Sequence, residues 1–121
     1  MNIFDDERAE RSDELITEAN EAFAEGEVER ARELYARAAE LETELALDAP
    51  GDRPEIKGML AESAVELWCN STEVERTRDA IKSLLAAPDA LPEPVYQRLT
   101  QIYATADRRA ELVNREDEPY F

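Results

Sequence analysis

The 121-residue chain contains no histidine, one cysteine and three glycines, and its basic side chains number only 14 against 30 acidic ones. Without histidine, neither Ser-His-Asp nor Cys-His catalysis can operate, and no imidazole is present to bind a metal. A single cysteine excludes an internal disulfide and a thiolate zinc cluster, and it suits a reducing compartment. We therefore expect no cofactor and no metal site, and we predict that the protein is not an enzyme.

The formal net charge is −16 at pH 7. Such a surface opposes nucleic acids and anionic membranes, because both are bound mainly through lysine and arginine. The N-terminus lacks the basic and apolar segments of a signal peptide, and no apolar run reaches the roughly 18 residues of a membrane span. We therefore expect a cytoplasmic protein with no direct contact to nucleic acid or membrane. The length suits a single domain over residues 1–121.

Alanine, glutamate, leucine and arginine dominate the composition, which favours helices. Apolar residues recur at spacings of three and four along the chain, which predicts an all-α fold with about six amphipathic helices and no strands. These helices are expected to pair into hairpins over approximately residues 6–49, 54–87 and 92–115, the third built from helices over 94–104 and 107–115. Residues 116–121 are expected to form a frayed tail.

An internal repeat is the most informative feature of the sequence. The segment Glu27–Glu33 reappears as Glu73–Asp79 with five of seven residues identical. The preceding segments also align, at an offset of 45 residues, so that Phe23 corresponds to Trp68, and a looser third copy places Tyr103 at this position. Each copy is a helix–turn–helix unit that buries its apolar face by stacking on its neighbours. A duplicated hairpin in an ordinary helical bundle is the alternative.

The first copy carries small residues, aromatics and a turn glycine at helical spacing: Ala19, Phe23, Gly26, Ala31, Tyr35 and Ala38. In this pattern it resembles a tetratricopeptide repeat (TPR). The second copy keeps Ala64 and Trp68, whereas the third has Leu99 where the family has a small residue. The offset between copies also exceeds the family's roughly 34 residues. The resemblance implies a right-handed stack of about three antiparallel hairpins, a TPR-like α-solenoid, with HEAT-like pairing as the alternative.

The same resemblance implies that the first helix of each copy lines a concave groove. The residues that it places there, and that we predict to contact a partner, are Ile16, Asn20, Val65, Trp68, Tyr96, Thr100 and Tyr103. Aromatic residues at a partly wet apolar surface are common binding anchors. The competing interpretation is that the aromatic residues are core between repeats, which applies to Phe23 as well.

A second candidate surface is a stripe of four glutamates on the first predicted helix: Glu14, Glu18, Glu21 and Glu25. They are spaced i, i+4, i+7 and i+11, so they share one helix face and repel each other. The stripe is either a solvated face or a docking surface for a basic partner, whose approach it would accelerate.

These patterns predict a non-catalytic protein–protein interaction module, such as an adaptor, scaffold or regulatory subunit. Its partner is expected to be another protein, which binds as a peptide or helix in the apolar groove or as a basic surface on the acidic stripe. The alternative is an acidic inhibitor that imitates nucleic acid and blocks a DNA- or RNA-binding protein. A homodimer is a further expectation, because stacked repeats associate through an uncovered terminal face.

Overall fold

The structure, a computed structural model, describes the backbone of residues 6–86 and 91–116 and the side chains up to residue 112. These residues form five helices and no strand, which confirms the all-α prediction. The helices are α1 (Glu7–Ala24), α2 (Val28–Asp48), α3 (Pro54–Ser71), α4 (Val74–Leu85) and α5 (Glu93–Glu116). None of them is long and apolar enough to cross a membrane.

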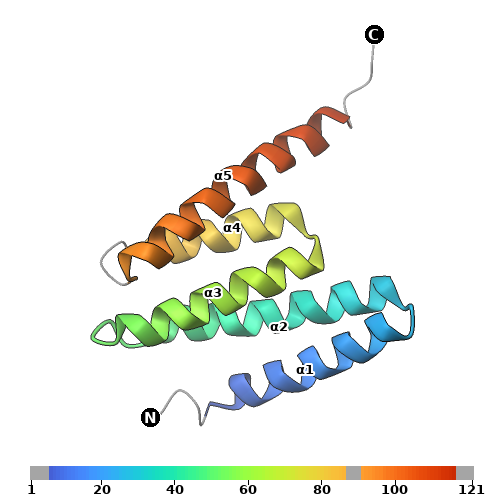
Figure 1. Cartoon of the computed structure of the whole chain (residues 1–121), viewed down its shortest axis with the longest axis horizontal. Coiled ribbons are helices and arrows are strands. Elements are labelled where there is room, and N and C mark those ends of the chain that lie inside the picture. The colour runs from blue at the N-terminus through green and yellow to red at the C-terminus, as the bar shows by residue number, and fades with distance from the viewer. Residues whose placement is uncertain (1–5, 87–90, 117–121) are drawn as a thin grey trace.

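The helices lie side by side in chain order, and each runs antiparallel to the one before it (Figure 1). Helix α2 packs extensively against both α1 and α3, whereas α4 packs mainly against α5. Helix α5 is twice as long as α4 and extends past it toward the C-terminus (Figure 1). The middle of α5 therefore passes the start of α4, and this crossing positions the candidate site described below.

The expected third hairpin is wrong. A single helix, α5, occupies the whole segment, without the expected break near residues 105–106. A helix normally ends where a residue leaves the helical region or lacks an N–H, and Thr105 and Ala106 do neither. The buried residues Leu99, Ala106 and Ala110 follow one another at helical spacing, so one continuous face of α5 packs on the rest of the molecule.

The same backbone conformation ends α1 and α3. Gly26 has a φ of 83° and Thr72 a φ of 60°, and each directly precedes the residue that caps the next helix, Glu27 or Glu73. A left-handed residue at this place lets the chain reverse direction immediately after a helix. The repeat in the sequence is therefore accompanied by a repeat in the turn conformation.

The core has two parts. The first lies mainly among α1, α2 and α3 and is rich in alanine, which lets helix backbones approach closely. Its larger members are Leu15, Leu34, Leu67 and Trp68. The second lies mainly among α3, α4 and α5 and is built from larger side chains. These include Val65, Ile81, Leu84, Leu91 and Leu99.

Candidate functional site

An apolar groove with a volume of about 300 Å³ opens at the C-terminal end of α3, beside the start of α4 and the middle of α5. We call it the α3–α5 groove. Its lining residues are Trp68, Cys69, Thr72, Val74, Thr77, Gln101, Ile102, Thr105, Ala106 and Arg109. No carboxylate is among them, and Arg109 is the one charged member. This composition contrasts with that of the chain, which has 30 acidic side chains.

Trp68 is held firmly in the wall of the α3–α5 groove, and only 4% of it is exposed. Its Nε1 donates a 3.0 Å hydrogen bond to Oγ1 of Thr43 on α2. The guanidinium of Arg76 on α4 lies 4.9 Å from the ring centroid, a cation–π distance, and also pairs with Glu40 on α2. Contacts from two helices therefore fix the indole, so that it shapes the groove instead of moving in it.

Hydrogen bonds also fix the end of α3. The hydroxyl of Ser71 donates a 2.6 Å hydrogen bond to the carbonyl of Trp68 and accepts one from the backbone N–H of Glu73. The hydroxyl of Thr77 on α4 lies 3.3 Å from the same Trp68 carbonyl, but its shorter hydrogen bond, of 2.7 Å, is donated to the carbonyl of Glu73. Carbonyls in the last turn of a helix have no partner within the helix, so the Ser71 hydroxyl supplies a donor that water would otherwise provide. The groove wall is consequently a preformed structure.

A second pocket, of about 410 Å³, lies on the α1–α2 side of the same helix end. We call it the α1–α3 pocket. Its lining residues are Phe23, Val28, Ala31, Arg32, Tyr35, Cys69, Asn70 and Thr72. It shares Cys69 and Thr72 with the α3–α5 groove, and it too contains one arginine and no carboxylate. Phe23 is 62% exposed, which makes it the most exposed large hydrophobic side chain of the described residues.

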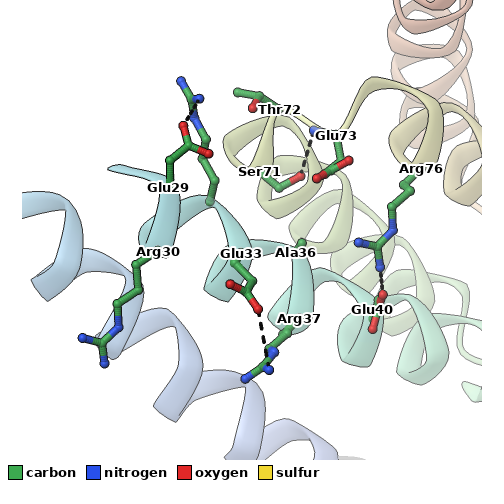
Figure 2. Close-up of a pocket in the computed structure, with 11 residues that line it drawn as sticks. Glu29, Arg30, Glu33, Ala36, Arg37, Glu40, Ser71, Thr72, Glu73 and Arg76 are labelled. Carbon is green, nitrogen blue, oxygen red and sulfur yellow. Dashed lines mark hydrogen bonds and ion pairs between the residues drawn. The ribbon is translucent and has the colours of Figure 1, made fainter. Parts of the chain in front are cut away.

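A wider cleft, of about 720 Å³, is charged and lies between α2 and the α3–α4 turn (Figure 2). Each arginine that lines it already pairs with a glutamate. The pairs are Arg30–Glu27, Arg32–Glu29, Arg37–Glu33 and Arg76–Glu40. The last of these connects α4 to α2, and it lies to one side of the cleft in Figure 2. The cleft is thus lined by an ion-pair network of the protein itself.

The structure does not bring the seven predicted contact residues together. Trp68 lines the α3–α5 groove, whereas Val65 is buried in the second core, with 2% of it exposed. Tyr103 packs against the same core and is half-buried. Tyr96 and Thr100 are exposed on α5 but do not line the groove.

The two predicted contact residues on α1 also have structural partners. Ile16 is half-buried against the first core, and Asn20 accepts a hydrogen bond from the hydroxyl of Tyr35 on α2. For the aromatic residues, the competing core interpretation describes Trp68 correctly. It is wrong for Phe23, which lies on the surface.

Sequence reasoning missed the groove residues on α4 and α5, above all Ile102, Thr105 and Arg109. The expected break in α5 placed Arg109 on a different helix from Ile102, so their relation was hidden. One signal could have revealed it. The three residues recur at i, i+3 and i+7, the spacing of one helix face.

The acidic stripe is on the surface, as its spacing indicates. Glu14, Glu18, Glu21 and Glu25 are all exposed along α1 and its C-cap. Glu14 pairs with Arg11 at 3.0 Å, whereas no ion pair joins the other three glutamates to any residue that the structure describes. Their mutual repulsion is therefore uncompensated by neighbours within this part of the chain.

Two groups have a raised pKa. Partial burial of its sulfur raises the pKa of the Cys69 thiol, with the nearby Arg109 opposing the shift and Glu66 adding to it, so the thiol is neutral at pH 7. Burial also raises the pKa of Glu42, although the Ser63 hydroxyl donates a 3.0 Å hydrogen bond to its carboxylate. A protonated thiol is a poor nucleophile, so the raised pKa disfavours a reactive role for Cys69.

Among the described residues, no group of three or more histidine, cysteine, aspartate or glutamate side chains could hold a metal ion. Comparison with known proteins finds no matching family model, no matching curated protein and no matching solved structure. The function must therefore be inferred from the chemistry of the surfaces themselves.

Proposed function

We propose that this protein is a non-catalytic protein–protein interaction module that binds a peptide or helix of another protein in the α3–α5 groove. One observation carries the proposal: the groove has apolar and uncharged polar walls, one arginine and no carboxylate in a strongly acidic chain. Binding sites are typically concave and mostly apolar, with a few polar groups that fix orientation. The fixed position of Trp68 adds support, because a preformed wall reduces the entropy lost on binding.

We further infer that hairpins α1–α2 and α3–α4 stack as TPR-like repeats, with α5 packed on the second hairpin. The support is the repeated sequence together with the left-handed turn that recurs at Gly26 and Thr72. Stacking of this kind aligns equivalent helix ends along one side of the molecule. It accounts for the contact between the α1–α3 pocket and the α3–α5 groove at Cys69 and Thr72.

Selection from a random dodecapeptide library, with the full chain as bait, tests the groove. Selected peptides are then measured against Thr105→Trp and Thr100→Trp. Thr105 is exposed and lines the groove, so an indole there fills it, whereas Thr100 is exposed on the same helix outside it. We expect at least about tenfold weaker binding to Thr105→Trp and unchanged binding to Thr100→Trp.

Circular dichroism of both variants verifies that α5 remains helical. Peptides that bind the two tryptophan variants equally well contradict the groove proposal. Loss of binding to Thr100→Trp alone would instead assign binding to the exposed Tyr96–Thr100 side of α5.

A second candidate function is the docking of a basic protein on α1. The observation in its favour is the line of exposed carboxylates, which are about 4.5 to 6 Å apart along the helix axis. Opposite charges on a partner would accelerate association. An inhibitor that imitates nucleic acid would use the same line, with carboxylates in place of phosphates.

A pull-down from the native host distinguishes the two surfaces. Partners of the acidic stripe should be lost with the double substitution Glu18→Lys and Glu21→Lys, and also in about 0.5 M salt, where exposed charges are screened. Partners of the α3–α5 groove should be lost with Thr105→Trp. A partner that tolerates all three conditions uses neither surface.

A further inference from the structure

The two pockets around the end of α3 adjoin each other, and neither has a carboxylate among its lining residues. The α3–α5 groove and the α1–α3 pocket meet at Cys69 and Thr72, which line both. The charged lining residues are Arg109 in the first and Arg32 in the second. About a quarter of the whole chain is acidic, so this lining differs in charge from the chain as a whole, although Arg32 and Thr72 also line the charged cleft that contains Glu29.

Both arginines are accessible to a partner. Arg109 is exposed, and no ion pair joins it to another side chain in the described part of the molecule. Arg32 pairs with Glu29 at 3.1 Å, but the two are on the same helix and Glu29 is 88% exposed. An exposed pair of this kind contributes little to stability, so Arg32 can exchange Glu29 for a carboxylate of a partner.

Each pocket also offers apolar surface. Phe23 and Val28 are exposed at the α1–α3 pocket, at 62% and 38%. In the α3–α5 groove, Val74 and Ile102 are half-buried beside the fixed indole of Trp68. An exposed aromatic next to a concave apolar surface is typical of an interaction site.

We infer that a single acidic amphipathic peptide segment occupies both pockets, with one apolar side chain in each and carboxylates paired to Arg32 and Arg109. The inference rests on the proposed function and specifies the chemistry of its partner. An acidic partner is the opposite of the basic partner that the net charge of −16 alone suggests. Long-range repulsion is screened within about 8 Å at physiological salt, so pairing with the two arginines at contact distance determines which partner binds.

Peptides selected on the full chain provide the probe. Their binding is measured by fluorescence anisotropy against Arg32→Glu, Arg109→Glu and the control Arg98→Glu. Arg98 is exposed on α5 outside both pockets, where it pairs with Glu62 on α3 at 3.1 Å, and its reversal changes the net charge by the same amount. We expect peptides richer in Asp and Glu than in Lys and Arg, with about tenfold weaker binding to each pocket variant and less than about twofold change for Arg98→Glu. The milder variants Arg32→Gln and Arg109→Gln should weaken binding about threefold, and they serve if a reversed charge disturbs folding.

The outcomes separate this inference from the proposed function. If Thr105→Trp blocks the peptides but they are basic or neutral, the acidic partner is excluded and the groove function stands. If Arg98→Glu weakens the peptides as much as the pocket variants do, specific pairing with Arg32 and Arg109 is excluded and the groove function stands. If Arg109→Glu weakens binding and Arg32→Glu does not, the peptide occupies one pocket only and the two-pocket inference is overturned. If no selected peptide is blocked by Thr105→Trp, the proposed function fails and this inference fails with it.

Discussion

Phe23 and Trp68 occupy equivalent positions in two copies of one sequence pattern, yet Phe23 is 62% exposed and Trp68 only 4%. The indole of Trp68 is hydrogen-bonded to Thr43 on the preceding helix α2 and covered by Arg76 on α4. The structure describes no helix before α1, so Phe23 has no equivalent of α2 to pack against. The same position of the repeat is therefore buried on α3, which has a helix packed on either side, and exposed on α1, the first helix that the structure describes.

This difference predicts unequal costs of truncation. Trp68→Ala should lower the free energy of unfolding by about 3–5 kcal/mol, the usual cost of removing a large buried aromatic. Phe23→Ala should lower it by less than about 1 kcal/mol, because little of its surface is buried. Urea unfolding measures both changes. It is followed by circular dichroism instead of tryptophan fluorescence, because Trp68→Ala removes the only tryptophan.

If Trp68→Ala does not fold, Trp68→Phe keeps most of the volume. It should still cost about 1–2 kcal/mol through the lost hydrogen bond to Thr43. Similar losses for Phe23→Ala and Trp68→Ala would contradict the asymmetry.

The sequence predicted the first four helices well, because apolar periodicity and Gly26 are local signals that packing reinforces. The hairpin expected over residues 6–49, for example, corresponds to α1 (Glu7–Ala24) and α2 (Val28–Asp48). The continuity of α5 was not predicted, because two helices were expected over residues 94–104 and 107–115 although no glycine or proline lies between them. Leu99, Ala106 and Ala110 are buried along one face of α5, and packing across the expected break is a long-range feature that the local pattern does not show.

The candidate site could be predicted only in part, since it depends on which helix ends meet. Trp68 was identified from the repeat, but the repeat cannot show that Val65 faces the second core. Arg109 could not be associated with Trp68 while α5 was expected to be two helices. Pocket shape arises from long-range packing, to which a single sequence gives no direct access.

Thr72 carries backbone strain that its repeat equivalent avoids. Its φ of 60° lies in the left-handed region, where a residue with a Cβ loses about 1–2 kcal/mol, and Gly26 fills the equivalent position in the first turn. Thr72→Gly should therefore raise the free energy of unfolding by about 0.5–1 kcal/mol, after the entropy cost of glycine is subtracted. Urea unfolding measures the change.

A threonine-to-glycine substitution within a helix should instead lower the free energy of unfolding. Thr100 is exposed within α5, so Thr100→Gly should destabilise by a few tenths of a kcal/mol. Gly26→Thr should cost about 1 kcal/mol. Destabilisation by Thr72→Gly would show that the threonine side chain contributes more than the strain costs.

Ionisation of the Glu42 carboxyl lowers the stability of the folded protein. Burial raises its pKa in the folded state, with Asp13 and Glu66 adding repulsion and the Ser63 hydroxyl opposing the shift. Because the folded pKa lies above the unfolded one, the contribution of Glu42 to stability falls as pH rises through this window. Glu42→Gln should be more stable than the wild type at pH 7, by under about 1 kcal/mol because the carboxylate keeps some solvent contact. Thermal unfolding at pH 3 should show no such gain, and a gain that persists at pH 3 would contradict a cause in ionisation.

Asp6 behaves in the opposite way. Hydrogen bonds from the Arg8 side chain and backbone N–H hold the pKa of Asp6 at about 2, below its ordinary value of 3.8. Because the folded pKa is the lower one, the stabilisation is complete above about pH 4 and is lost as pH falls toward 2. Asp6→Asn keeps a residue that caps helices well, so its melting temperature should decline less steeply than that of the wild type between pH 4 and 2. Parallel curves for the two proteins would show that Asp6 does not contribute to the acid sensitivity.

The acidic stripe on α1 should cost stability that a single reversal recovers. Glu21 lies three residues after Glu18 and four before Glu25, all exposed, and each such like-charge pair costs about 0.2–0.5 kcal/mol. Glu21→Lys turns both repulsions into attractions and adds a cation to the last turn of α1, which has none. The free energy of unfolding should rise by about 0.5–1 kcal/mol in low salt, and most of this gain should vanish in about 1 M NaCl.

Glu55→Lys in the first turn of α3 changes the net charge equally but places a cation where the helix dipole disfavours it. If Glu55→Lys lowers the free energy of unfolding while Glu21→Lys raises it, the effect comes from local geometry. Equal increases for the two variants would assign it to the net charge of the whole chain.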